Sequence, residues 1–134
     1  MITAGLKQAW RDAIYSVKTN VGTTHFRIER AADNLEALPQ CRSVTVITAW
    51  NPKGSTQPQA ENDRAQAQLF DYVREQGYCF APANGASPDG SHVEESLAVF
   101  DLDEAGACAL GARFGQGAVM YWDGGEARLV WMPD

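Results

Sequence analysis

The chain has 134 residues, of which 45% are hydrophobic and 21% charged, and this ordinary globular composition excludes a disordered tail or a coiled coil. The net charge of −6 comes from 17 acidic and 11 basic residues scattered without a lysine or arginine run, which disfavours a nucleic-acid-binding protein, because such proteins need clustered positive charge. No apolar run approaches the roughly 18 residues of a membrane span and the start lacks the layout of a signal peptide, so we expect one cytoplasmic domain covering residues 1–134.

The first half of the chain predicts two short helices and three strands. The helices are expected over residues 3–12 and 32–38, and the strands over 13–20, 24–30 and 43–50. The first two strands alternate apolar and polar side chains, which is typical of half-exposed hairpin partners. The third is apolar or β-branched on both faces, and we therefore expect it at the centre of a sheet that is covered on both sides.

The second half predicts a longer helix, a shorter one and four more strands. Turn-rich segments separate them at 51–58, at 84–91 and at the hairpin turn 123–125. The helices are expected over about 58–76 and over 104–114, and the strands over 78–83 (broken at Pro82), 93–102, 117–122 and 127–132. About four helices and six or seven strands in mixed order favour the α+β class, with a mixed or mostly antiparallel sheet.

The cysteines and histidines are too far apart to suggest a metal site or a disulfide framework. Cys41, Cys79 and Cys108 contain no CxxC pair, and His25 and His92 have no ligand-spaced partner. No cofactor-binding motif is present either, since the loop before the long helix lacks the GxxxxGK[ST] pattern. We therefore expect no metal and no cofactor.

Four segments, in this order and spacing, resemble the bacterial DUF3293 family of unknown function. They are ITAWNP (47–52), Glu61-Asn62, DGSHVEES (89–96) and RFGQ (113–116). The resemblance extends over about residues 9–131 and implies a small bacterial cytosolic domain, but it implies no activity. His92 stands where the family usually has an aromatic residue, and this departure argues against His92 as a required ligand or base.

Polar side chains at the end of the central strand predict a small-molecule pocket. Asn51 ends that strand, and Asn62 opens the following helix on the same face as Leu69 and Val73. A buried amide must find hydrogen-bond partners, and the junction between a strand end and a helix is a frequent ligand position. The predicted lining is Thr48, Trp50, Asn51 and Asn62. The alternative is structural, with Asn51 capping a turn and Asn62 holding the loop backbone.

A second set of candidates comes from the strand beginning at 93 and the end of the last helix. Glu94 and Glu95 are adjacent in a strand, so their side chains should point to opposite faces of the sheet. We expect one of them to face inward and to pair with Arg113, either structurally or to orient a ligand. Gln116 follows the helix end and is not required by the local backbone, which makes it a candidate ligand contact.

Three functions stay open on the sequence. The first is a non-catalytic binding module for a small molecule or a protein partner, with an apolar cleft and amide hydrogen bonds. The second is an enzyme, a hydrolase or transferase on a small polar substrate, with Glu94 or Glu95 as acid/base and Arg113 as anion clamp. The third is an interaction subunit that uses the hairpin 117–132, and a homodimer through this hairpin also stays open.

Overall fold

The computed structural model describes residues 2–133, which form an α+β fold as the sequence predicts. The helices are α1 (Ala4–Asp12), α2 (Gln59–Glu75) and α3 (Glu104–Arg113), with 3₁₀ turns η1 (Leu35–Ala37) and η2 (Pro52–Gly54). The strands are β1 (Ile14–Lys18), β2 (Thr23–Phe26), β3 (Val44–Ile47), β4 (Phe80–Ala86), β5 (Val93–Phe100), β6 (Ala118–Trp122) and β7 (Arg128–Trp131). No helix within residues 2–133 is long and apolar enough to cross a membrane.

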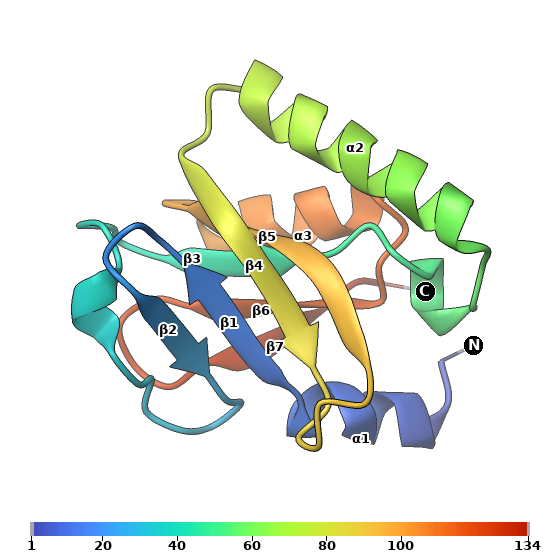
Figure 1. Cartoon of the computed structure of the whole chain (residues 1–134), viewed down its shortest axis with the longest axis horizontal. Coiled ribbons are helices and arrows are strands. Elements are labelled where there is room, and N and C mark those ends of the chain that lie inside the picture. Colours follow the sequence, from blue (N-terminus) through green and yellow to red (C-terminus); the bar gives the residue numbers. More distant parts are fainter. Residues whose placement is uncertain (1, 134) are drawn as a thin grey trace.

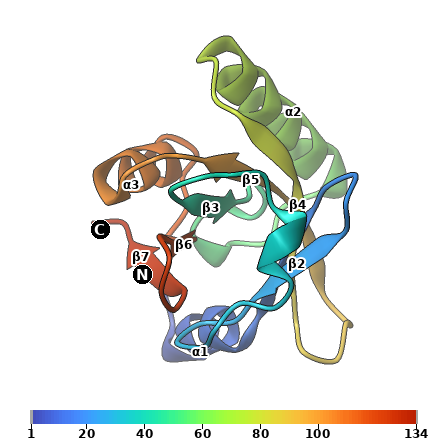
Figure 2. The same cartoon turned by 90° about the vertical axis from the view of Figure 1, so that its left-hand side faces the viewer.

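The strands form one curled antiparallel sheet. Their order is β2-β1-β4-β5-β3-β6-β7, and every neighbouring pair is antiparallel. β3 lies between β5 and β6 with all four of its residues buried, which confirms the predicted central strand. The backbone N–H of Glu29, after β2, donates to the carbonyl of Ala127, before β7, at 2.8 Å. The two ends of the sheet are therefore linked, and the sheet encloses an inner face (Figure 2).

Alternation along the strands separates two apolar clusters. The inner face holds Val17, Phe26, Val44, Val46, Ala81, Ala83, Ala98, Phe100, Met120, Trp122 and Ala127. On the outer face, Leu69 and Val73 of α2 and Ala107 and Leu110 of α3 pack against the sheet. α2 and α3 cover the outer face, whereas α1 lies at the far end of the sheet from α2 (Figure 1). The inner face is therefore filled with apolar side chains along most of the strands and meets α1 at one end.

The predicted helix over 32–38 is wrong, because only the 3₁₀ turn η1 forms there. Asn34 takes a left-handed conformation with φ 65° and ψ 48°, which a right-handed helix cannot contain. Its side-chain amide donates to the carbonyl of Thr23 at 2.9 Å, and its own carbonyl accepts from the Thr24 hydroxyl at 2.8 Å. Tertiary hydrogen bonds to β2 therefore replace the helical ones.

The predicted loop over 84–91 is also partly wrong, because β4 continues through Pro82 to Ala86. Ala83 to Ala86 pair with β1 on one side and with β5 on the other. Pro82 lies one residue beyond the stretch that pairs with β1, and proline is tolerated where a strand lacks a neighbour. Three residues that read as a turn-rich segment, Asn84 to Ala86, are thus inside the sheet.

Candidate functional site

A cavity of about 270 Å³ lies between α1 and the inner face of the sheet, and we call it the α1 cavity. It is lined by Leu6, Ala9, Trp10, Ala13, Tyr15, Asn51, Gly54, Thr56, Gly85, Ala86, Ser87, His92, Glu94 and Gln116. A smaller pocket that shares five of these residues continues along the inner face to Val46 and Met120. The cavity is thus the open end of the inner core, where polar side chains replace apolar ones.

A glycine on the middle one of three neighbouring strands leaves part of this space empty. Gly85 of β4 is paired with Tyr15 of β1 on one side and with Glu94 of β5 on the other. The three residues form a row across the inner face, and a Cβ atom at Gly85 would lie 3.5 Å from the Tyr15 ring. Tyr15 and Glu94 therefore flank a gap that any larger residue at 85 would fill. Glycine inside a strand often marks such a close approach.

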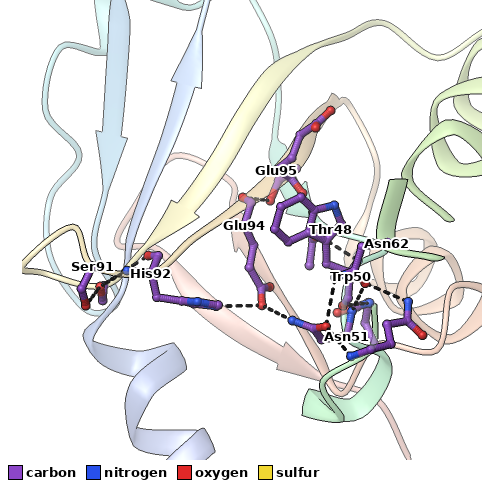
Figure 3. A network of polar contacts seen from close by, with 12 residues as sticks. Thr48, Trp50, Asn51, Asn62, Ser91, His92, Glu94 and Glu95 are labelled. Atoms are coloured by element: carbon purple, nitrogen blue, oxygen red, sulfur yellow. Dashed lines mark hydrogen bonds and ion pairs between the residues drawn. The ribbon is translucent and has the colours of Figure 1, made fainter. Parts of the chain in front are cut away.

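Glu94 carries the charge of the cavity and joins a short polar network (Figure 3). Its Oε2 accepts from Asn51 Nδ2 at 3.2 Å and contacts His92 Nε2 at 3.1 Å. Among residues 2–133, no side chain or backbone group donates to Glu94 Oε1. The Glu94 side chain is 22% exposed, so the described residues hold one carboxylate oxygen and leave the other without a donor.

Asn51 is fixed by Asn62, which lies behind it at the start of α2. Asn51 is left-handed, with φ 45° and ψ 63°, a conformation that asparagine tolerates better than most residues. Asn62 Oδ1 accepts from the Asn51 backbone N–H at 3.0 Å, and Asn62 Nδ2 donates to Asn51 Oδ1 at 3.1 Å. Gln57 also donates its backbone N–H to Asn51 Oδ1 at 3.2 Å. With Oδ1 engaged on this side, Asn51 Nδ2 points to Glu94.

Tyr15 and Gln116 present oxygen atoms to the cavity because their hydrogens are engaged elsewhere. The Tyr15 hydroxyl donates to the carbonyl of Trp10 at 2.6 Å. Burial, and then the charge of Glu94, raise the pKa of Tyr15, so its phenol stays neutral. Gln116 Nε2 donates to the carbonyls of Trp50 at 3.2 Å and Phe114 at 3.4 Å. Each of these side chains thus keeps an acceptor oxygen for a ligand.

The structure brings most of the sequence-predicted residues to this end of the sheet. Asn51, Glu94 and Gln116 line the cavity itself, and Thr48 lines the adjoining pocket. Trp50 contributes its carbonyl to Gln116, while its buried indole Nε1 has no hydrogen-bond partner among residues 2–133. Asn62 ties the loop backbone down, which is the structural role that the sequence left open. Ligand binding by these residues stays a prediction.

Two predicted residues lie away from the cavity, and the expected pairing of Arg113 with a glutamate is wrong. Glu95 points to the opposite face from Glu94, as expected, and is exposed. The Arg113 guanidinium lies 4.2 Å from the centre of the Tyr72 ring. It lines a separate surface depression with Asp71, Tyr72 and Glu75, between the ends of α2 and α3. The end of α3 faces α2 on the outer side of the sheet, whereas Glu94 is on the inner side.

Trp10, Tyr15 and Gly85 line the cavity but are not among the residues that the sequence predicts. Neither Trp10 nor Tyr15 belongs to a motif, and nothing local shows that α1 folds across the end of the sheet. Gly85 read as part of a turn because Asn84 to Ser91 are rich in turn residues. The signal for Gly85 in the sequence is a glycine next to a predicted strand, which can mark a close approach of another group.

Within residues 2–133, no group of three or more histidine, cysteine, aspartate or glutamate side chains is placed to hold a metal ion. The polar groups of the cavity are instead one carboxylate, amides, hydroxyls and an imidazole. Such groups bind organic ligands by hydrogen bonds and charge.

A family model described as "Protein of unknown function (DUF3293)" matches residues 47–119, which is more than half of the chain. The chain belongs to the DUF3293 family. The matched range is shorter than the 9–131 suggested by the motifs and includes Asn51, Gly85, Glu94 and Gln116, but not Tyr15. No curated protein matches this DUF3293 chain. No solved structure matches it either.

Proposed function

We propose that this DUF3293 chain is a binding module that takes a small organic molecule into the α1 cavity. The observation that carries the proposal is the row formed by Tyr15, Gly85 and Glu94, in which a glycine gap separates an aromatic ring from a carboxylate. The space of about 270 Å³ is close to the lower end of known ligand pockets. A compact ligand of a few functional groups fits this volume.

The polar groups of the cavity are held in place before any ligand arrives. Asn51 is fixed by Asn62 and Gln57, and Gln116 by two backbone carbonyls. A ligand would therefore lose little free energy in ordering these side chains, which favours affinity. Leu6 and Ala9 of α1, and Ala13 directly after it, supply apolar contact area.

A second candidate function is an enzyme in which Glu94 acts as acid/base. The contact of 3.1 Å between His92 Nε2 and Glu94 Oε2 favours it, because two titratable groups at a cavity can pass a proton. The anion clamp expected from Arg113 is not at this site, since Arg113 stacks on Tyr72. Binding without turnover is therefore the first proposal, and any hit should also be checked for conversion by NMR.

The proposal extends to where the protein acts and to its partners. The motif resemblance implies a bacterial cytosolic protein with a single domain, and its scattered basic residues argue against nucleic acid as a partner. A protein partner or a homodimer formed through the β6–β7 hairpin is the remaining alternative to a small ligand.

The test is a thermal-shift screen of a metabolite library on wild type, Gly85→Leu and Gly125→Leu. Leucine at 85 would fill the gap between Tyr15 and Glu94, whereas leucine at 125 adds the same side chain where nothing lies within 4 Å. A ligand at a hundred times its dissociation constant adds about 2.7 kcal/mol. We expect hits that stabilise wild type and Gly125→Leu but not Gly85→Leu.

The control on folding is the melting temperature of each variant without ligand. A Gly85→Leu protein that unfolds cooperatively but has lost its hits supports the proposal. Hits that survive in Gly85→Leu, or a complete lack of hits with wild type, would contradict it and redirect the search to protein partners.

A further inference from the structure

We infer that the ligand of the α1 cavity is an organic ammonium ion, a protonated amine with a small apolar or aromatic part. The inference rests on the proposed function and adds the chemical class of the ligand.

The charge of the cavity is negative. Glu94 is its only carboxylate, and the described residues that line it include no lysine or arginine. His92 contacts only Oε2 of Glu94, and with a side chain 64% exposed it makes this contact at the solvent edge. The Glu94 side chain is mostly withdrawn from water, and a partly desolvated carboxylate is stabilised by a cation placed beside it.

Three side chains that line the cavity, those of Glu94, Tyr15 and Gln116, keep free hydrogen-bond acceptors. Glu94 Oε1 accepts no hydrogen bond from residues 2–133, and Gln116 Oε1 likewise has no protein donor there. The Tyr15 hydroxyl gives its single hydrogen to the Trp10 carbonyl, so its oxygen is left as an acceptor. An ammonium group carries up to three hydrogens and no acceptor, and it complements this set. A carboxylate or phosphate would meet the same oxygens with repulsion.

Two aromatic rings line the same cavity as the carboxylate. Trp10 of α1 and Tyr15 of β1 both line the cavity next to Gly85 and Glu94. The faces of such rings attract cations, and tryptophan is the strongest of them. Leu6 and Ala9 extend the apolar wall along α1. An amine with an apolar substituent would therefore contact the carboxylate with its charged end and α1 with its other end.

The experiment compares three probes of one shape and different charge: benzylammonium, benzyl alcohol and benzoate. Each is titrated into ¹⁵N-labelled wild type, Glu94→Gln and Glu95→Gln proteins, and amide shifts of the cavity residues are followed. Glu94→Gln removes the charge but keeps an oxygen for Asn51, and Glu95→Gln is the matched control on the opposite face. For wild type and Glu95→Gln, we expect the dissociation constant of benzylammonium to be at least about tenfold lower than that of benzyl alcohol.

The outcomes separate the ligand class from the existence of a ligand site. Benzyl alcohol or benzoate binding the cavity as tightly as benzylammonium would overturn the ammonium inference and leave the binding proposal standing. Equal benzylammonium affinity in Glu94→Gln and wild type would overturn it too. Loss of the preference for benzylammonium over benzyl alcohol in Glu94→Gln, but not in Glu95→Gln, supports the inference. The comparison of the probes on wild type does not depend on how well any variant folds.

Discussion

At the scale of single residues, the cavity depends on how Asn51 is held. Asn51, a left-handed residue in the loop after β3, directs its side-chain amide toward Glu94, and the buried Asn62 holds its backbone N–H and its Oδ1. Asn62 is only 4% exposed, so its polar atoms and those of Asn51 depend on each other for partners. The pair therefore shapes one wall of the α1 cavity.

We predict that Asn62→Ala lowers the free energy of unfolding by about 1–3 kcal/mol, because the backbone N–H of Asn51 loses its acceptor in a partly buried place. Urea denaturation measures the loss. Asp63→Ala is the matched control, since Asp63 is exposed and bonded only to Gln59, and surface changes of this kind stay within about 0.5 kcal/mol. Equal stability of the two variants would refute the role given to Asn62.

We predict that the hydrogen bonds of Asp89, in the loop beside the cavity, are lost in acid. The Ser91 backbone N–H, followed by the hydroxyls of Ser91 and Ser87, holds the pKa of Asp89 at about 2, below its ordinary 3.8. Because the folded pKa is lowered, the contribution of Asp89 to stability is present above pH 3.8 and is lost as the pH falls toward 2. A carboxyl ¹³C titration should show a midpoint near 2, and Asp89→Asn should remove that step. A midpoint at the ordinary value would show that these hydrogen bonds do not form in solution.

At the scale of elements, α1 covers the cavity and lies on the surface of the fold. None of its residues is buried. It is attached by the Tyr15 hydroxyl bond to Trp10 and by the tilted contact of Trp10 with Trp131, whose ring centres are 5.9 Å apart. A helix of nine residues has little stability of its own, so these contacts decide how often it opens.

We predict that Tyr15→Phe speeds amide hydrogen exchange in α1 and leaves β4 and β5 unchanged. Removal of one hydrogen bond costs about 0.5–1.5 kcal/mol. Here the bond joins Tyr15 to α1, so we expect the loss to lower the free energy of opening of α1 alone. Tyr121→Phe is the matched control, because its hydroxyl donates to the Leu102 carbonyl at 2.8 Å on the outer face. Similar exchange of α1 in wild type and Tyr15→Phe, or equal acceleration in both variants, would argue against α1 as a separately opening cover.

At the scale of the whole molecule, local patterns predict most of the elements but not which of them lie side by side. The run Val44 to Ile47 is apolar or β-branched on both faces and is the central strand, and Asp103 caps α3 by accepting from the Gly106 N–H at 2.7 Å. The opposite directions of Glu94 and Glu95 follow from strand geometry alone. These features are fixed by neighbours in the chain, and the sequence therefore carries them.

The features that the sequence does not predict depend on contacts between distant segments of the chain. Arg113 was assigned to the glutamates although the end of α3 faces α2 across the outer side of the sheet. The strand order, and the closure of the sheet through Glu29 and Ala127, bring Trp131 and Trp10 together. No periodicity in a single sequence encodes such pairings. Gly85 became meaningful only once its partners Tyr15 and Glu94 were known.

The central claim is that the gap at Gly85 is a binding site for a small organic molecule. The most direct measurement is the change in the amide shifts of Tyr15, Gly85 and Glu94 when benzylammonium is titrated into wild type and into Gly85→Leu. We predict saturable changes centred on these residues and their neighbours in wild type, and their loss in the folded variant, in which a leucine side chain occupies the gap. Changes that are scattered over the surface, or that persist unaltered in Gly85→Leu, would contradict the claim.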